Sequence, residues 1–510
     1  MATKIICIAN QKGGVGKTTT ARNQYSTERG KLTRSLLRLE RVQHFHTAFI
    51  GDTGSGKSVT AERIAYETTR EWQFRSAVDF GQGWRKALKW PGMKSRVDIR
   101  QLYPGAVRPI RWNPLQIPKR IDPVHYRNLV VELFANAGRM GPRQLGFIRE
   151  ALTRHYVNCG VLIPDDDYEL FQDGLPQARN PDPEERRNRE RYRITEEREL
   201  WRFVGNASEE TVINQARRER GLEERASQST PLEELEPFER QALAVYRSRR
   251  ASVAEWVRIL RALLKKHERD PNIRTSLQGV LLRVEPLAEG EMHRMYGLGY
   301  DTIAIEDLGL AEGASDPWGM AVIEGGAVMD EFSKSALLSL IATILYEDAV
   351  VRRRESLSGV RFPPLQIYFE EANKILTGVE TGASSDSDSR GGNQTAQIFL
   401  NMWRDGRKYQ IFLHVLAQTV SELPRGILSS CNNAFFGQTK DDHDRAAILA
   451  HLARNTKGFV NSDYDRFIKL GYTQEIAQME PYLIRPLMLR VEEPGDPEIY
   501  SHYQTMGMVV

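Results

Sequence analysis

An octet rich in glycine, from Gly51 to Ser58, contains the residue types that bind a chain of phosphates. The segment reads GDTGSGKS and fits the pattern GxxxxGK[ST]. Its glycines allow consecutive backbone N–H groups to turn towards an anion, and its lysine adds a positive charge. We therefore expect a nucleotide to be held by Gly51, Asp52, Thr53, Gly54, Ser55, Gly56, Lys57, Ser58 and Val59.

The last two residues of the octet are expected to act on different parts of the nucleotide. Lys57 is placed to neutralise the β- and γ-phosphates, and Ser58 to ligate a Mg²⁺ ion that bridges the same oxygens. A helical pattern follows, so the positive end of a helix dipole would also face the phosphates. ATP and Mg²⁺ are thus the expected cofactors.

A short apolar run that ends in two carboxylates, residues 365–371, is the expected acidic partner of the octet. Glu370 would ligate the metal through water, and Glu371 would orient or deprotonate the water that attacks the γ-phosphate. The alternative is that both are solvated glutamates at the start of a helix, where the helix dipole favours them. The presence of the octet favours the catalytic interpretation.

Two further polar residues flank the apolar run 411–416. Gln418 follows the run and is placed to sense the γ-phosphate or the water, unless it belongs to an ordinary turn. Arg407 precedes the run within DGRKY, and its planar guanidinium suits the γ-phosphate of a neighbouring subunit. The alternative for Arg407 is a basic surface turn, and Arg404 and Arg425 are weaker candidates for the same role.

The elements that must position these residues are apolar strands that alternate with helices. This alternation is typical of a mostly parallel sheet covered by helices on both faces, so the predicted fold class is α/β. We expect strands at residues 47–50, 76–80, 319–324, 365–369, 411–416 and 434–436.

A densely charged stretch separates two parts of this pattern. Residues 184–191, for example, contain only glutamate, arginine and one asparagine, and the acidic residues offset the arginines. A solvated helical surface is therefore favoured over a nucleic-acid-binding arm. We predict a charged, mainly helical insertion at 163–250, between a first part of the ATPase core at 29–162 and a second part at 251–510.

The overall composition excludes several classes of protein. The 71 lysines and arginines nearly balance the 67 aspartates and glutamates, and the net charge of +4 does not by itself indicate a nucleic-acid-binding protein. The three cysteines, Cys7, Cys159 and Cys431, form no CxxC pair, which fits a reduced, cytoplasmic protein. No apolar segment is long enough for a membrane span, so we expect none.

At four segments the chain resembles the HerA/FtsK superfamily. They are GDTGSGKS, the strand IYFEEA, the block DGRKYQIFLHVLAQTVSELPRGILSSCNNAFF and the segment NPLQIP, which is also similar to conjugation ATPases. The resemblance implies a RecA-like core, a homo-hexameric ring and a channel through which ATP hydrolysis drives double-stranded DNA. It also implies a site between subunits, which Arg407 would complete. Glu370 stands where the family usually has aspartate.

The first 23 residues resemble instead the start of ParA-type partition ATPases, with signature lysines at Lys12 and Lys17. The similarity stops there, whereas a complete domain of this kind needs roughly 200 residues. We therefore expect residues 1–28 to be a leader and not a second ATPase site. Because only about fifty residues precede the octet, we also expect no β-barrel of the kind that helps HerA proteins bind a nuclease.

Several functions are compatible with these motifs. The main hypothesis is a ring-forming motor that translocates double-stranded DNA, with a nuclease or another effector as a candidate partner. The alternatives are a type IV secretion or conjugation-type traffic ATPase, a virus genome-packaging ATPase, a ParA-like partition switch and a nucleotide-binding scaffold. Glu370, Glu371 and Gln418 favour hydrolysis over a scaffold, and the short ParA match argues against partition.

Overall fold

The computed structural model describes about three fifths of the chain, mainly in its central part. Gly54 to Gly56, Glu371 and residues 163–202 lie outside the described residues. The described ranges are 27–28, 31–32, 46–53, 57–72, 75–78, 83–103, 106–162, 203–225, 230–296, 303–308, 319–325, 331–355, 364–370, 392–421, 423, 425–431, 433–436, 441–444, 446–447, 483–491 and 502–509.

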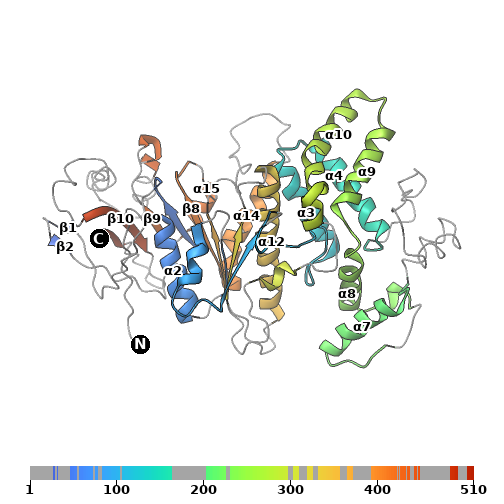
Figure 1. Ribbon diagram of the computed structural model, residues 1–510, viewed down its shortest axis with the longest axis horizontal. Helices are drawn as coiled ribbons and strands as arrows, with labels where there is room; N and C mark the ends of the chain where they lie inside the picture. The colour runs from blue at the N-terminus through green and yellow to red at the C-terminus, as the bar shows by residue number, and fades with distance from the viewer. Residues whose placement is uncertain are drawn as a thin grey trace.

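A nine-stranded sheet forms the centre of the molecule (Figure 1). The strands from β9 to β5 are parallel, while β10 pairs antiparallel with both β9 and β11. The mostly parallel α/β sheet predicted from the sequence is therefore confirmed. In spatial order the strands are β11 (His502–Val509), β10 (Leu483–Val491), β9 (Asn433–Phe436), β3 (Thr47–Ile50), β8 (Ile411–Ala417), β7 (Leu365–Phe369), β4 (Arg75–Val78), β6 (Met320–Glu324) and β5 (Val97–Gln101).

The central strands are buried on both faces, which explains their continuous apolar sequences. Alternate residues of one strand point to opposite faces. In β7, Ile367 and Phe369 belong to the larger core cluster, while Tyr368 between them belongs to the smaller one. The two faces of the sheet therefore pack into two separate clusters of buried side chains.

Helices cover both faces of the sheet. The helix α2 (Lys57–Trp72) packs into the smaller core cluster, together with the 3₁₀ helix η1 (Gly83–Lys89). The larger cluster on the opposite face includes α12 (Glu331–Glu355) and α14 (Gly392–Asp405). Figure 1 shows α2 on one side of the sheet and α12 with α14 on the other.

A group of helices stands beyond α12, away from the sheet (Figure 1). Pairwise contacts join α3 to α12, α4 to α3, and α9 to both α4 and α10. Side-chain caps begin several of these helices, as where Asp122 accepts a hydrogen bond from the His125 N–H. The group consists of α3 (Pro123–Ala137), α4 (Pro142–Asn158), α7 (Ala207–Glu219), α8 (Pro237–Ser248), α9 (Val253–Lys266) and α10 (Pro271–Val284).

Only part of the predicted insertion at 163–250 can be compared with this helical group. Helices α7 and α8 lie within it, and residues 163–202 lie outside the described part of the chain. The division into 1–28, 29–162, 163–250 and 251–510 remains a prediction. Among the described helices, none has both the length and the apolar character needed to span a membrane.

Candidate active site

The turn that leaves β3 begins at Gly51. Its φ of 152° lies in a region that favours glycine. The Gly51 N–H donates to the Ala417 carbonyl at 3.3 Å, so the pairing of β3 with β8 continues one residue beyond the strand. The chain therefore turns towards α2 from a fixed point at the carboxyl edge of the sheet.

Lys57 is the first residue of α2, and its ammonium folds back over this turn. Its Nζ donates to the Gly51 carbonyl at 2.6 Å and to the Asp52 carbonyl at 3.1 Å. The positive charge and the amino-terminal end of α2 therefore lie together, an arrangement that binds anions. Of the other predicted nucleotide-binding residues, Thr53 is exposed and Val59 is partly buried.

The side chains of Ser58 and Glu370 meet although 312 residues separate them in sequence. Ser58 Oγ donates to Glu370 Oε1 at 2.6 Å, the short distance of a charge-assisted hydrogen bond. Glu370 directly follows β7, and only β8 lies between β7 and β3. Since these strands are parallel, their carboxyl ends share one edge, and the structure brings together the two predicted metal ligands there.

Trp84 holds the second oxygen of the same carboxylate, a contact that the sequence did not suggest. Its Nε1 donates to Glu370 Oε2 at 2.8 Å, and its side chain is fully buried beside Tyr368. A Cβ added at Gly83 would lie 3.5 Å from that oxygen, so the backbone also approaches the carboxylate closely. Both oxygens of Glu370 therefore have fixed partners.

A second carboxyl group, that of Glu62, lies one turn beyond Ser58 on α2. It forms a 2.8 Å ion pair with Lys86 Nζ. Burial raises the pKa of Glu62 to about 7; Lys86 acts to lower that pKa and the charge of Glu370 adds to the rise. The carboxylates of Glu62 and Glu370 are thus electrostatically coupled.

The residue between Trp84 and Lys86 contacts a third carboxylate. Arg85 makes a bidentate pair with the fully buried Glu324, with two distances of 2.7 Å. Glu324 ends β6 and also accepts from Gln101 Nε2 at 3.0 Å. Three consecutive residues of η1 therefore each contact a different acidic group, two of them at the carboxyl ends of strands and the third on α2.

Gln418 lies at the end of β8, the strand between β3, which leads into the phosphate loop, and β7, which leads into Glu370. It directly follows β8, which pairs with both β3 and β7, and it is exposed. Gln418 therefore follows the strand that lies between β3 and β7. Glu371, the predicted water-orienting residue, lies outside the described residues.

Arg407 lies at the other end of the strands, where β8 begins. It belongs to the 3₁₀ helix η7 (Gly406–Tyr409), which precedes β8, and it is exposed. The seven residues of β8 place Arg407 and Gln418 roughly 20 Å or more apart, at about 3.3 Å per residue. The structure therefore does not bring Arg407 to the Lys57 of its own chain, and a role at a phosphate would have to be played across a subunit boundary.

Comparison with known proteins supports the fold at the level of solved structures. No protein-family model matches the chain, and no curated protein matches its sequence. VirB4 of Thermoanaerobacter pseudethanolicus matches with a TM-score of 0.50 and 13% identity, over 87% of this chain and 89% of that one. The chain has the α/β P-loop NTPase fold of VirB4.

A second solved structure covers more of the chain at lower similarity. The bacterial conjugative coupling protein TrwBdeltaN70, in its trigonal form in complex with sulphate, matches with a TM-score of 0.45 and 12% identity, over 99% of this chain and 93% of that one. The fold class predicted from the sequence is thus confirmed through VirB4. The narrower resemblance to HerA and FtsK proteins remains a prediction.

The residues that sequence reasoning missed are those of η1. A buried tryptophan usually finds a partner for its indole N–H, so Trp84 beside Arg85 and Lys86 was a signal that a polar contact exists. The identity of that partner could not be deduced, because Glu370 is 286 residues away.

Proposed function

We propose that this chain is the ATP-hydrolysing subunit of a molecular motor in the type IV secretion and conjugation class. The observation that carries the proposal is the 2.6 Å contact between Ser58 Oγ and Glu370 Oε1, beside the ammonium of Lys57. The fold shared with VirB4 favours this class over the HerA-type assignment, which the sequence placed first.

The oxygens of Ser58 and Glu370 suit Mg²⁺, which prefers one or two protein oxygen ligands together with water and phosphate oxygens. When bound there with ATP, the ion would neutralise charge on the β- and γ-phosphates. Ser58 and Glu370 would hold it, and Trp84 would keep the carboxylate of Glu370 turned towards Ser58. Lys57 would bind the same phosphates from the helix end.

The remaining catalytic roles fall to residues at the same edge. Glu371 follows Glu370 and would orient or deprotonate the attacking water. Gln418 would sense the γ-phosphate by a hydrogen bond, because β8 places it between the two halves of the site. A phosphate-dependent shift of Gln418 would then reach the loop that follows β8.

The position of Arg407 supports an assembly of several copies. Arg407 precedes β8 and so lies at the end of the strands away from the phosphate loop. An arginine in that position can contact a γ-phosphate only when the nucleotide is bound by a second subunit. We therefore propose a homo-hexameric ring in which Arg407 of one subunit completes the site of the next. A nuclease or another effector remains a candidate partner of the ring.

Double-stranded DNA is the proposed cargo, and linear duplex DNA provides the test. The ATPase rate is measured with and without the duplex, alongside particle imaging. Strong stimulation together with a six-fold ring supports a DNA motor. Turnover that the duplex leaves unchanged would reject DNA as the cargo and favour protein traffic by the same ATPase core.

A further inference from the structure

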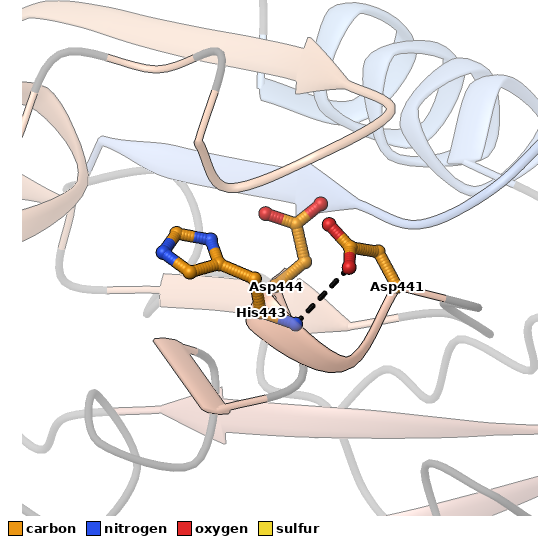
Figure 2. Close-up of side chains that lie close together, drawn as sticks. All are labelled: Asp441, His443 and Asp444. Atoms are coloured by element: carbon orange, nitrogen blue, oxygen red, sulfur yellow. Dashed lines mark hydrogen bonds between the residues drawn. The ribbon is translucent and has the colours of Figure 1, made fainter.

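Three side chains with metal-binding groups gather just after β9, outside the site described above. They are Asp441, His443 and Asp444, and one ligand atom from each lies within 4.8 Å of the others. Figure 2 shows the two carboxylates turned to the same side, with the His443 ring beside them. The Asp441 carboxylate is held in place, because its Oδ1 accepts the His443 N–H at 3.1 Å.

The buried member of this cluster provides an independent reason to expect a cation. Asp444 is fully buried, and its Oδ1 accepts the Ser421 N–H at 3.0 Å. Its Oδ2 is also buried and has no hydrogen-bond partner among the described residues. An unsatisfied buried carboxylate oxygen is costly, because it has lost its hydration without replacement. A cation at the cluster would supply the missing partner.

We propose that Asp441, His443 and Asp444 form a site for a divalent transition-metal ion, with Zn²⁺ as the preferred ion. Two carboxylates and an imidazole are ligands that Zn²⁺ accepts, whereas Mg²⁺ and Ca²⁺ prefer oxygen alone. Ligand atoms around Zn²⁺ lie about 3–3.5 Å apart, given bonds of about 2.1 Å. The Asp441 carboxylate is already fixed, so the exposed His443 side chain would rotate to close the remaining distance.

Such an ion would also fix the loop that follows β8. Asp444 Oδ1 holds Ser421, which is three residues beyond Gln418. Binding of Asp444 Oδ2 to the metal would immobilise this carboxylate and, through it, the backbone at Ser421. This consequence rests on the proposed role of Gln418, whereas metal binding itself does not.

The test is calorimetric titration of Zn²⁺ into the full chain without nucleotide. We expect one equivalent to bind, and Mg²⁺ in excess not to displace it. Asp441→Ala and His443→Ala should each weaken binding by more than about tenfold, because even the loss of a residue that only supports a metal ligand costs about 10- to 100-fold. Asp442→Ala is the matched control, since Asp442 is an exposed carboxylate of the same segment outside the cluster. Its affinity should equal that of the wild type.

Two results would overturn the proposal. One is the absence of a tight equivalent in the wild type, and the other is binding that survives in the Asp441→Ala, His443→Ala double variant. Asp441 and His443 are both exposed, so the folding of the single and double variants can be checked by comparing their Tm with that of the wild type. Because the titration contains no ATP, a protein that binds Zn²⁺ but lacks ATPase activity would refute the proposed function and leave the metal site standing.

Discussion

Replacement of Trp84 by phenylalanine isolates the hydrogen bond that orients Glu370. Phenylalanine keeps an aromatic ring beside Tyr368 but removes the N–H that donates to Oε2 at 2.8 Å. A hydrogen bond to a charged group contributes about 1.5–3 kcal/mol. At about 1.36 kcal/mol per tenfold change in rate, its loss should lower kcat by roughly 10- to 150-fold.

The assay combines ATP turnover with Mg²⁺-dependent binding of a fluorescent ATP analogue. If Trp84 acts through Glu370, Trp84→Phe should weaken Mg²⁺-dependent binding and leave Mg²⁺-free nucleotide binding unchanged. In a Glu370→Ala background the same replacement should have no further effect, because the acceptor is already gone. This double-mutant cycle separates positioning from general damage to the core.

Trp90→Phe provides the matched control. Trp90 packs edge-to-face against Trp84 at a centroid distance of 6.4 Å and belongs to the same short segment. It should lower stability slightly and leave kcat within about twofold of the wild type. If Trp84→Phe behaves like this control, or if its effect adds in full to that of Glu370→Ala, the positioning role is refuted.

The other predictions concern three charged residues. Glu62→Gln should stabilise the protein relative to the wild type at pH 8 but hardly at pH 5. The raised pKa of Glu62, about 7, means that the wild type loses stability as pH rises from about 4.5 to about 7, on the order of a few kcal/mol. A Tm difference that is equal at both pH values would contradict this. Glu371→Gln should trap ATP with little turnover, and normal turnover in single-cycle kinetics would remove Glu371 from catalysis. Arg407→Ala should keep nucleotide affinity but lose turnover, and in rings mixed with Lys57→Ala subunits it should regain part of the rate; an unchanged rate in the mixture would argue against a trans arginine.

The strands and the pairing at their ends were predictable from the sequence because burial imposes a local pattern. The apolar run 365–369 became β7 with the same bounds, and 411–416 became β8 with one added residue. Once these strands are parallel, Glu370 and Ser58 must share an edge. The apolar pattern that identifies each strand is local in sequence, although the contact between Ser58 and Glu370 joins distant parts of the chain.

The contacts of η1 could not be predicted, because they depend on which strands become neighbours. Nothing in the local sequence of Trp84 or Arg85 indicates Glu370 or Glu324, which follow by more than 200 residues. The antiparallel strands β10 and β11 were missed for a different reason. β10 contains Pro486 and two arginines, so it has no continuous apolar run.

The position of Arg407 could have been derived from the sequence alone. Arg407 and Gln418 are only eleven residues apart in the chain. A seven-residue strand lies between them, and an extended strand places its two ends at opposite edges of the sheet. That separation makes the trans role the one to test.

The most direct test of the central claim is the Mg²⁺-dependent ATPase rate of three proteins measured side by side. The wild type should hydrolyse ATP, Lys57→Ala should show no turnover above background, and Lys17→Ala should match the wild type. An active Lys57→Ala protein, or loss of activity in Lys17→Ala alone, would show that the working site is not the one built by Lys57, Ser58 and Glu370.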